Sequence, residues 1–292
     1  MTGLIVKGIA GFYYVRTEDG TVYQCKARGV FKKDKITPMI GDVVDITVPE
    51  IGDAVIDRIH ERKNEFIRPP VSNVDMFVIV TAIKDPDPVP AVLDKFLVMA
   101  EKSHTEIAIC VNKTDLATDE EINKLVSVYE NLYPVFLVSA EKGIGIDKLE
   151  KHIAGKHAAL AGPSGAGKST ILNALKETEL METGSVSHKT GRGRHTTRHV
   201  EIFEMPSGGM IFDTPGFTSF EVLDADEEEL QFLYPEMKDF IGKCKYDNCR
   251  HLREPDCAVR NAVSEGYISK ERYRSYLTQL LEIKEREKTK YD

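Results

Sequence analysis

Residues 162–169 read Gly-Pro-Ser-Gly-Ala-Gly-Lys-Ser and match G-x-x-x-x-G-K-[ST], the phosphate-binding loop of nucleotide-binding proteins. This motif requires a strand before it and a helix after it. The apolar run 158–161 predicts the strand, and the spacing of apolar residues over 171–175 predicts the helix. A glycine-rich turn before an ordinary helix is the alternative, and further motifs in the chain decide against it.

The residue types of the loop account for phosphate binding. Its glycines let successive backbone N–H groups point inward, Lys168 supplies a positive charge for the β- and γ-phosphates, and the Ser169 hydroxyl can bind Mg²⁺. The N-terminus of the following helix adds a partial positive charge. The predicted nucleotide contacts here are Gly162, Pro163, Ser164, Gly165, Ala166, Gly167, Lys168, Ser169 and Thr170.

Composition is that of a soluble globular protein, with 41% hydrophobic and 29% charged residues in 292. No apolar run approaches the roughly 20 residues that cross a bilayer, and residues 1–10 lack the features of a signal peptide, so we expect a cytoplasmic protein without membrane contact. The net charge of −8 arises in the middle of the chain, where residues 71–235 carry 26 acidic and 15 basic groups. The nearly neutral ends remain compatible with a nucleic-acid partner.

Residues 1–67 predict a small β-barrel of the oligonucleotide-binding (OB) type that binds RNA. The expected strands are Leu4–Ala10, Phe12–Arg16, Thr21–Ala27, Asp42–Val48 and Ala54–Ile59. Between them lies a basic loop with an aromatic residue, made of Lys26, Arg28, Phe31, Lys32, Lys33 and Lys35. It either follows a phosphate backbone, with Phe31 stacking on a base, or is simply solvated. Arg68-Pro69-Pro70 predicts a linker.

Residues 71–222 predict an α/β domain. Buried strands are expected at Met76–Ala82, Ile107–Val111 and Val135–Val138, with helices at Val89–Glu101 and Asp119–Tyr129. Asn-Lys-Thr-Asp at 112–115 and Ser-Ala-Glu at 139–141 follow two of these strands. Both motifs therefore lie where α/β sheets bind ligands, although either one alone could be an ordinary helix entry.

The two short motifs predict recognition of guanine. The Asp115 carboxylate can accept hydrogen bonds from the ring N–H and the exocyclic amine of guanine, whereas adenine presents the opposite polarity there. Asn112 can contact the other ring edge, the Lys113 stem can lie over the base, and the Ala140 N–H can donate to the guanine carbonyl, with Ser139 in the same motif. An adenine would leave Asp115 unsatisfied, at a cost of roughly 1–3 kcal/mol per buried group.

A polar segment at 185–198 and Asp-Thr-Pro-Gly at 213–216 predict the two switch regions of a GTPase. Thr196 or Thr197 could bind Mg²⁺ together with Ser169 and Asp213, and the Gly216 N–H could approach the γ-phosphate. The sequence does not choose between the two threonines; we take Thr196 as the Mg²⁺ ligand and both as nucleotide contacts. Arg192, Arg194 and Arg198 make an RNA-contacting loop the alternative, and both roles are compatible.

The residue after Gly216 is Phe217, where GTPases of the Ras type use glutamine to orient the attacking water. An apolar ring cannot do this, so hydrolysis needs another group. His195, beside the candidate threonines, is our hypothesis, because a neutral imidazole accepts a hydrogen bond from water near pH 7. A structural or RNA-facing role for His195 is the alternative. The predicted catalytic residues are thus His195, Lys168 and Gly216.

Cys244, Cys249, His251 and Cys257 near the C-terminus predict a structural Zn²⁺ site. Three thiolates and one imidazole complete a tetrahedron and leave no open catalytic position. A disulfide or unligated thiols are the alternatives. The helix 269–287 carries Tyr273, Tyr276, Leu277, Leu280 and Ile283 on one face to pack against residues 223–292, and its opposite face is rich in Lys and Arg, either to meet RNA or to be solvated.

In chain order the guanine motifs precede the phosphate loop, so the GTPase is predicted to be circularly permuted. With the N-terminal barrel and the Cys/His cluster, the whole chain resembles the ribosome small subunit-dependent GTPase A (RsgA) family. The resemblance implies a GTPase that acts late in assembly of the small ribosomal subunit, is stimulated by it and docks on its RNA. It implies cycling between GTP and GDP with Mg²⁺, one structural Zn²⁺ per chain and a monomer. Glu141, where many GTPases have lysine, departs from the usual motif.

Two further expectations concern the effect of the bound nucleotide on the C-terminal domain and the functional class of the protein. The chain runs from 213–216 through an acidic, helix-like stretch at Asp224–Leu233 into the C-terminal domain, so nucleotide state is predicted to set that domain's orientation and its affinity for the ribosome. An RNA-docking factor whose hydrolysis is incidental is the alternative function. An ATPase or kinase using the same loop is disfavoured by Asp115.

Overall fold

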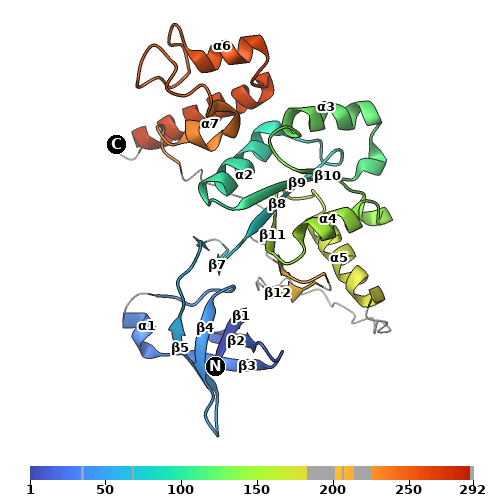
Figure 1. Ribbon diagram of the computed structural model, residues 1–292, viewed down its shortest axis with the longest axis vertical. Helices are drawn as coiled ribbons and strands as arrows, with labels where there is room; N and C mark the ends of the chain where they lie inside the picture. The colour runs from blue at the N-terminus through green and yellow to red at the C-terminus, as the bar shows by residue number, and fades with distance from the viewer. Residues whose placement is uncertain (34–35, 68, 183–200, 206, 214–224, 290–292) are drawn as a thin grey trace. The chain divides into compact units, whose positions relative to one another are not determined.

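The computed structural model describes residues 1–33, 36–67, 69–182, 201–205, 207–213 and 225–289 (Figure 1). The chain divides into two compact units, each built from several segments of sequence. One unit contains Met1–Phe77, Asp147–Leu160 and Ser169–Thr218, and the other contains Val78–Ile146, Ala161–Lys168 and Ser219–Asp292. In the described part of the chain, no helix is long and apolar enough to cross a membrane.

The N-terminal strands close into the expected five-stranded barrel. They are β1 (Thr2–Ile9), β2 (Phe12–Thr17), β3 (Val22–Ala27), β4 (Val43–Thr47) and β5 (Ala54–Ile59), with a short helix α1 (Gly29–Lys33) after β3. The ring closes because β1 pairs with both β2 and β4, while β5 pairs with β4 and, in parallel, with β3. Alternate residues point inward, and Ile5, Val15, Cys25, Val44 and Ile56 are fully buried.

Strand β1 also belongs to a second pairing. Its first residues, Thr2–Leu4, lie against β4, whereas Lys7 pairs with Glu201 of β12 (Glu201–Glu204) after a register shift between Ile5 and Lys7. The register shift is a bulge, which bends a strand and increases its twist. Strand β12 forms an antiparallel hairpin with β13 (Met210–Asp213), and β13 pairs in parallel with β11 (His157–Ala161). Helices α4 (Ile146–Ile153) and α5 (Lys168–Glu182) flank β11 in the chain.

The residues on either side of the predicted linker, 68–70, are held against the barrel. Strands β6 (Glu65–Phe66) and β7 (Val71–Ser72) form a hairpin whose Ser72 donates a 2.6 Å hydrogen bond to the buried Asp42 carboxylate. Arg62 donates to both oxygens of Asp42, at 2.7 and 2.8 Å. A buried carboxylate needs such partners, and these contacts fix the chain that leaves the barrel.

Phe31 corrects the prediction for the basic loop. Its side chain is only 8% exposed and belongs to the core, so the ring is not available to stack on a base. Arg28 forms an ion pair with Asp57, and Lys26 with Asp53. Because aspartates offset these two charges, the loop offers less to a phosphate backbone than its sequence indicates.

The second unit contains a parallel arrangement of strands in the order β10-β9-β8. These are β8 (Met76–Ala82), β9 (Glu106–Asn112) and β10 (Val135–Leu137), joined by α2 (Pro90–Lys102) and α3 (Asp119–Tyr129). Every residue of β8 is buried. Helix α3 begins at a capping box between Thr118 and Glu121, which explains its exact start. Short 3₁₀ turns, η1 (Thr114–Leu116) and η2 (Ala140–Lys142), follow β9 and β10.

The C-terminal region of this unit contains two short turns and two helices, η3 (Leu230–Leu233), η4 (Pro235–Met237), α6 (Ala258–Glu265) and α7 (Lys270–Thr289). The expected acidic helix at Asp224–Leu233 is not formed over its described part, because only Leu230–Leu233 are helical, as a 3₁₀ turn. Asp226 limits where the turn begins, because its carboxylate accepts the N–H groups of Glu228 and Glu229 as an N-cap does.

Helix α7 packs against α2 through polar as well as apolar contacts. Tyr276, Leu280 and Ile283 lie in the core as expected, and Arg272, four residues before Tyr276 on the same face, is fully buried with them. Its guanidinium donates to Asp94 of α2 at 2.6 Å and to Glu236 at 2.7 Å. Burial raises the pKa of the Asp94 carboxyl, although Arg272 opposes this shift. The buried face of α7 therefore contains a charged residue that was not predicted.

Candidate nucleotide site and metal centre

Three of the predicted GTPase motifs meet around one buried side chain, Asn112 at the end of β9. Asn112 is 2% exposed, its amide donates to the Ala166 carbonyl of the phosphate loop at 3.0 Å, and its oxygen accepts the Ala140 N–H at 3.1 Å. Segments 112–115, 139–141 and 162–169 are therefore joined through a single carboxamide. Because both ends of this buried amide form hydrogen bonds, the orientation of its side chain is fixed.

Packing explains two of the loop glycines. At Gly162, φ is +142° and an added Cβ would lie 2.1 Å from the Val80 carbonyl oxygen. At Gly167, φ is +92° and a Cβ would lie 2.2 Å from the Asn112 amide nitrogen. Both positions therefore require glycine for space as well as for backbone conformation.

Lys168 is held within the loop. Its ammonium donates to the carbonyls of Gly162 and Pro163 at 2.7 and 2.8 Å. Burial lowers the pKa of Lys168 to about 8. A bound phosphate would favour the charged form again, because an opposite charge offsets desolvation. Ser164, Ser169 and Thr170 are exposed and Pro163 is half-buried, so these side chains are accessible beside the loop.

The guanine motif is organised around Asp115. Ser139 donates a 2.6 Å hydrogen bond to one oxygen of Asp115, and Lys142 forms a 3.2 Å ion pair with the other. These contacts, the Ser139 hydrogen bond first, lower the pKa of the Asp115 carboxyl and keep it ionised. An ionised carboxylate has capacity for about four hydrogen bonds, so two remain for a purine edge. Lys142 follows Glu141 directly and supplies a positive charge to this motif.

The loop after β8 is a part of the site that the sequence analysis did not identify. Lys113, whose backbone is left-handed at φ +62°, donates from its ammonium to the Asp85 carbonyl. Pro86 lies next to the phosphate loop, since a Cβ at Gly165 would be 3.2 Å from its ring. Lys84 pairs with Glu121 at the start of α3. The only sequence signal for this loop is its position after a buried strand.

The structure is consistent with parts of the predicted contact set and leaves others undescribed. The Ala140 N–H that we assign to the guanine carbonyl donates here to the Asn112 oxygen. A bound guanine would therefore share this N–H with Asn112 or replace Asn112 as its acceptor. Asp213 ends β13, but its side chain is not among those described. The predictions for His195, Thr196, Thr197 and Gly216, and those for Arg192, Arg194 and Arg198, lie outside the described residues.

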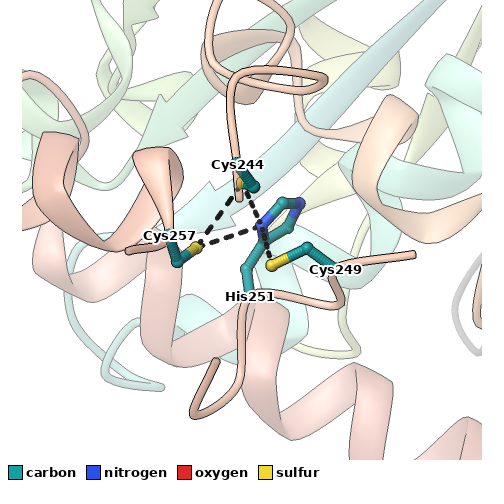
Figure 2. Close-up of side chains that lie close together, drawn as sticks. All are labelled: Cys244, Cys249, His251 and Cys257. Carbon is teal, nitrogen blue, oxygen red and sulfur yellow. Dashed lines mark hydrogen bonds between the residues drawn. The ribbon is translucent and has the colours of Figure 1, made fainter. Parts of the chain in front are cut away.

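The four predicted metal ligands converge on one point (Figure 2). Their ligand atoms all lie within 4.8 Å of one another. The His251 Nδ1 is 3.6, 3.4 and 3.3 Å from the sulfurs of Cys244, Cys249 and Cys257, and the sulfurs of Cys244 and Cys257 are 3.8 Å apart. Tetrahedral Zn²⁺ with bonds of about 2.3 Å to sulfur separates two thiolates by roughly 3.8 Å, so the set fits zinc. All four ligand residues, three cysteines and one histidine, lie in the loop before α6.

Surrounding groups orient this cluster. The His251 Nε2 lies 2.9 Å from the Gln231 side-chain oxygen, which leaves Nδ1 facing the sulfurs. Tyr273 and Tyr276 of α7 donate to the backbone carbonyls of His251 and Arg250 at 2.5 and 3.0 Å. None of the five cysteines forms a disulfide, and Cys25 and Cys110, which lie outside the cluster, are buried. Gln231 is a contributor that the sequence pattern did not reveal.

Comparison with known proteins shows which family the chain belongs to. The model of the RsgA GTPase family matches residues 59–223, and that of the RsgA N-terminal domain matches residues 2–56. The chain is 47% identical over 295 residues, covering all of both proteins, to the small ribosomal subunit biogenesis GTPase RsgA of Clostridium beijerinckii. This chain belongs to the RsgA family. It is therefore a GTPase of the small ribosomal subunit biogenesis class, as the family resemblance implied.

Other RsgA relatives support the same assignment. The RsgA of Agathobacter rectalis is 46% identical over 99% of this chain and all of that protein. The crystal structure of YloQ, a circularly permuted GTPase, matches with a TM-score of 0.82 and 38% identity over 98% of this chain and 95% of that one. YjeQ from Thermotoga maritima matches with a TM-score of 0.84 and 34% identity over 97% and 98%. The predicted permutation and the three-part fold of barrel, GTPase and Cys/His region are confirmed.

Proposed function

We propose that this GTPase binds GTP with Mg²⁺ at the site joined by Asn112 and hydrolyses it to GDP and phosphate while bound to the small ribosomal subunit. The observation that carries the proposal is the convergence of the phosphate loop and both guanine motifs on one buried amide. Asp115 would select guanine, Lys168 would neutralise phosphate charge, and Ser169, Thr196 and Asp213 would hold Mg²⁺. Mg²⁺ held by these residues would supply positive charge against the phosphates.

The flanking regions are proposed to dock the protein. We assign residues 1–67 to an RNA-binding barrel, 71–222 to the GTPase and 223–292 to a zinc-stabilised docking domain, acting as a monomer late in subunit assembly. The names of the relatives, small ribosomal subunit biogenesis GTPases, support the partner. Nucleotide state would then control release from the subunit. Equal affinity of the GTP-analogue and GDP complexes for small subunits would contradict this control.

GTP turnover with and without small ribosomal subunits tests the activity. We expect marked stimulation by subunits, and preference for GTP over ATP in a competition assay. Negligible stimulation would favour the alternative, an RNA-docking factor in which GTP binding alone is the signal. Effective competition by ATP would contradict the role of Asp115.

His195→Ala tests the proposed water-orienting residue. We expect roughly 10²–10⁴-fold slower turnover, the range for loss of a group that assists proton transfer, with little change in GTP affinity. His199→Ala is the matched control, because it removes a histidine four residues further along the chain. Unchanged turnover of the His195→Ala protein would remove His195 from the mechanism and leave Lys168 and Gly216 as the proposed catalytic groups.

A further inference from the structure

An acidic strap, residues Ala225–Gln231, connects the region after the Asp-Thr-Pro-Gly motif to the C-terminal helices and loop. Its carbonyl and side chains meet partners on three different elements of the unit. Glu227 pairs with Lys284 of α7 at 3.2 Å, and Glu229 pairs with Lys102 of α2 at 2.8 Å. The remaining tethers are Arg286 to the Ala225 carbonyl at 2.7 Å and Arg250 to Glu228 at 2.5 Å. The strap is therefore positioned over its whole length.

The last residue of the strap contacts a metal ligand. Gln231 is 7% exposed and His251 is 1% exposed, and the Gln231 oxygen lies 2.9 Å from the His251 Nε2. Since a carboxamide oxygen only accepts hydrogen bonds, Nε2 must carry the imidazole proton. The other nitrogen, Nδ1, then has a free lone pair directed at the three sulfurs. This is the tautomer that a tetrahedral metal site requires from a histidine bound through Nδ1.

The orientation of the Gln231 amide is also determined. Its nitrogen donates to the Glu228 carbonyl at 3.0 Å. Exchanging the two ends of the amide would place the amide oxygen, an acceptor, against this carbonyl oxygen and the NH₂ group against His251. The Glu228 carbonyl is in turn placed by the turn in which Asp226 accepts the N–H groups of Glu228 and Glu229. A chain of contacts thus runs from Asp226 through Gln231 to His251.

We propose that Gln231 is a positioning residue of the metal centre, which selects the His251 tautomer and holds the ring toward the sulfurs. The inference rests on the proposed zinc site. His251 needs such support because its backbone is left-handed, at φ +59°, in a loop without regular structure. Outer hydrogen-bond partners of metal-binding histidines typically change metal affinity by about 10–100-fold. The strap thereby makes metal affinity depend on a segment outside the 244–257 cluster.

Zinc affinity of the full-length protein, measured by competition with a chromogenic chelator, tests the proposal. Gln231→Leu keeps the volume but removes the acceptor, and we expect about 10–100-fold weaker zinc binding. Gln231→Glu keeps an acceptor oxygen and should stay close to the wild type. Glu229→Gln is the matched control, because it weakens a strap tether to Lys102 without touching His251, and its zinc affinity should be unchanged.

A spectroscopic measurement complements the affinities. In the zinc-loaded wild type, ¹⁵N NMR of labelled histidine should show His251 bound through Nδ1 with a proton on Nε2. Wild-type zinc affinity in folded Gln231→Leu, or zinc bound through Nε2 in the wild type, would overturn the proposal, the second result even if the variant does not fold. A wild type that binds no zinc would instead overturn the zinc site itself, and Gln231 would lose its role with it.

Discussion

The nucleotide site and the metal centre each contain one buried carboxamide that positions other groups, Asn112 in the first and Gln231 in the second, but the two amides act on different kinds of partner. Asn112 joins backbone groups of segments that are far apart in the chain, whereas Gln231 acts on a single ligand side chain. Asn112 lies within a recognised motif, and Gln231 lies outside the cluster it supports. Asn112 thus helps to assemble a site from several segments, whereas Gln231 orients one ligand within a site.

The two regions also differ in what is complete before a ligand arrives. The four metal ligands already lie at distances that fit Zn²⁺, with three of the four residues buried. The phosphate loop instead turns Lys168 onto its own carbonyls, and its hydroxyl residues are exposed. We therefore expect metal loss to affect stability most, and changes at the nucleotide site to affect affinity.

Metal removal should have the largest effect. Because three thiol groups and an imidazole would be left together in the core, chelation should lower the thermal midpoint of the zinc-loaded protein by roughly 5–10 °C, equivalent to a few kcal/mol. Differential scanning calorimetry before and after chelation measures this, with zinc added back as the control. An unchanged midpoint would mean that the cluster contributes no stability as a metal site.

Asn112→Ala should weaken GDP binding by roughly 100-fold. The substitution leaves the Ala166 carbonyl and the Ala140 N–H without their partner, at about 1–3 kcal/mol for each buried group. Equilibrium titration with fluorescent GDP measures the loss. Asn123→Ala on the exposed face of α3 is the matched control, and near-normal affinity of the Asn112→Ala protein would show that the three motifs do not depend on this amide.

Gly167→Ala should weaken GDP binding more than Gly165→Ala. Both residues have positive φ, which costs an L-residue roughly 1–2 kcal/mol, but only at Gly167 would a Cβ meet the Asn112 amide nitrogen at 2.2 Å. At Gly165 the closest atom is 3.2 Å away on a proline ring. Equal losses in the same titration would indicate that backbone strain alone sets the effect, without displacement of Asn112.

The smallest effect is a pH dependence of GDP affinity. Because the pKa of Lys168 is lowered to about 8, the Lys168 ammonium of the free protein loses its positive charge as pH rises through that value. A bound phosphate favours the protonated form of Lys168. GDP binding should therefore take up a proton above about pH 8, and affinity should fall by at most about tenfold per pH unit. Calorimetry in buffers of different ionisation enthalpy detects the uptake, and Lys168→Ala should abolish it. Affinity that stays flat between about pH 7.5 and 9 would contradict the shifted pKa.

The sequence predicts most of the fold because its patterns are local. Alternation predicted the barrel strands, the strand Met76–Ala82 and helix Asp119–Tyr129 match their observed bounds exactly, and the Cys/His spacing located the metal ligands. The motif order also identified the permutation. Each of these signals lies within a short stretch of chain, where periodicity or spacing is sufficient evidence.

The missed features depend on contacts between distant segments. The local pattern around Arg272 does not reveal the partners that a buried guanidinium needs, because Asp94 and Glu236 lie on other elements. Phe31 looked like an accessible ring in a basic loop, yet tertiary packing buries it. Gln231 and the Asp85 carbonyl contribute through geometry that no motif records. Tertiary context decides such cases over local pattern.

The division of β1 between two partners has a consequence for how the protein is made. The barrel strands leave the ribosome first, but the hairpin that pairs with the Lys7 end of β1 is encoded much later, at β12 and β13. Until that hairpin is synthesised, this end of β1 is an unpaired strand edge, the kind of surface that recruits other chains. The newly made barrel therefore keeps one exposed strand edge until β12 and β13 of the GTPase have been synthesised.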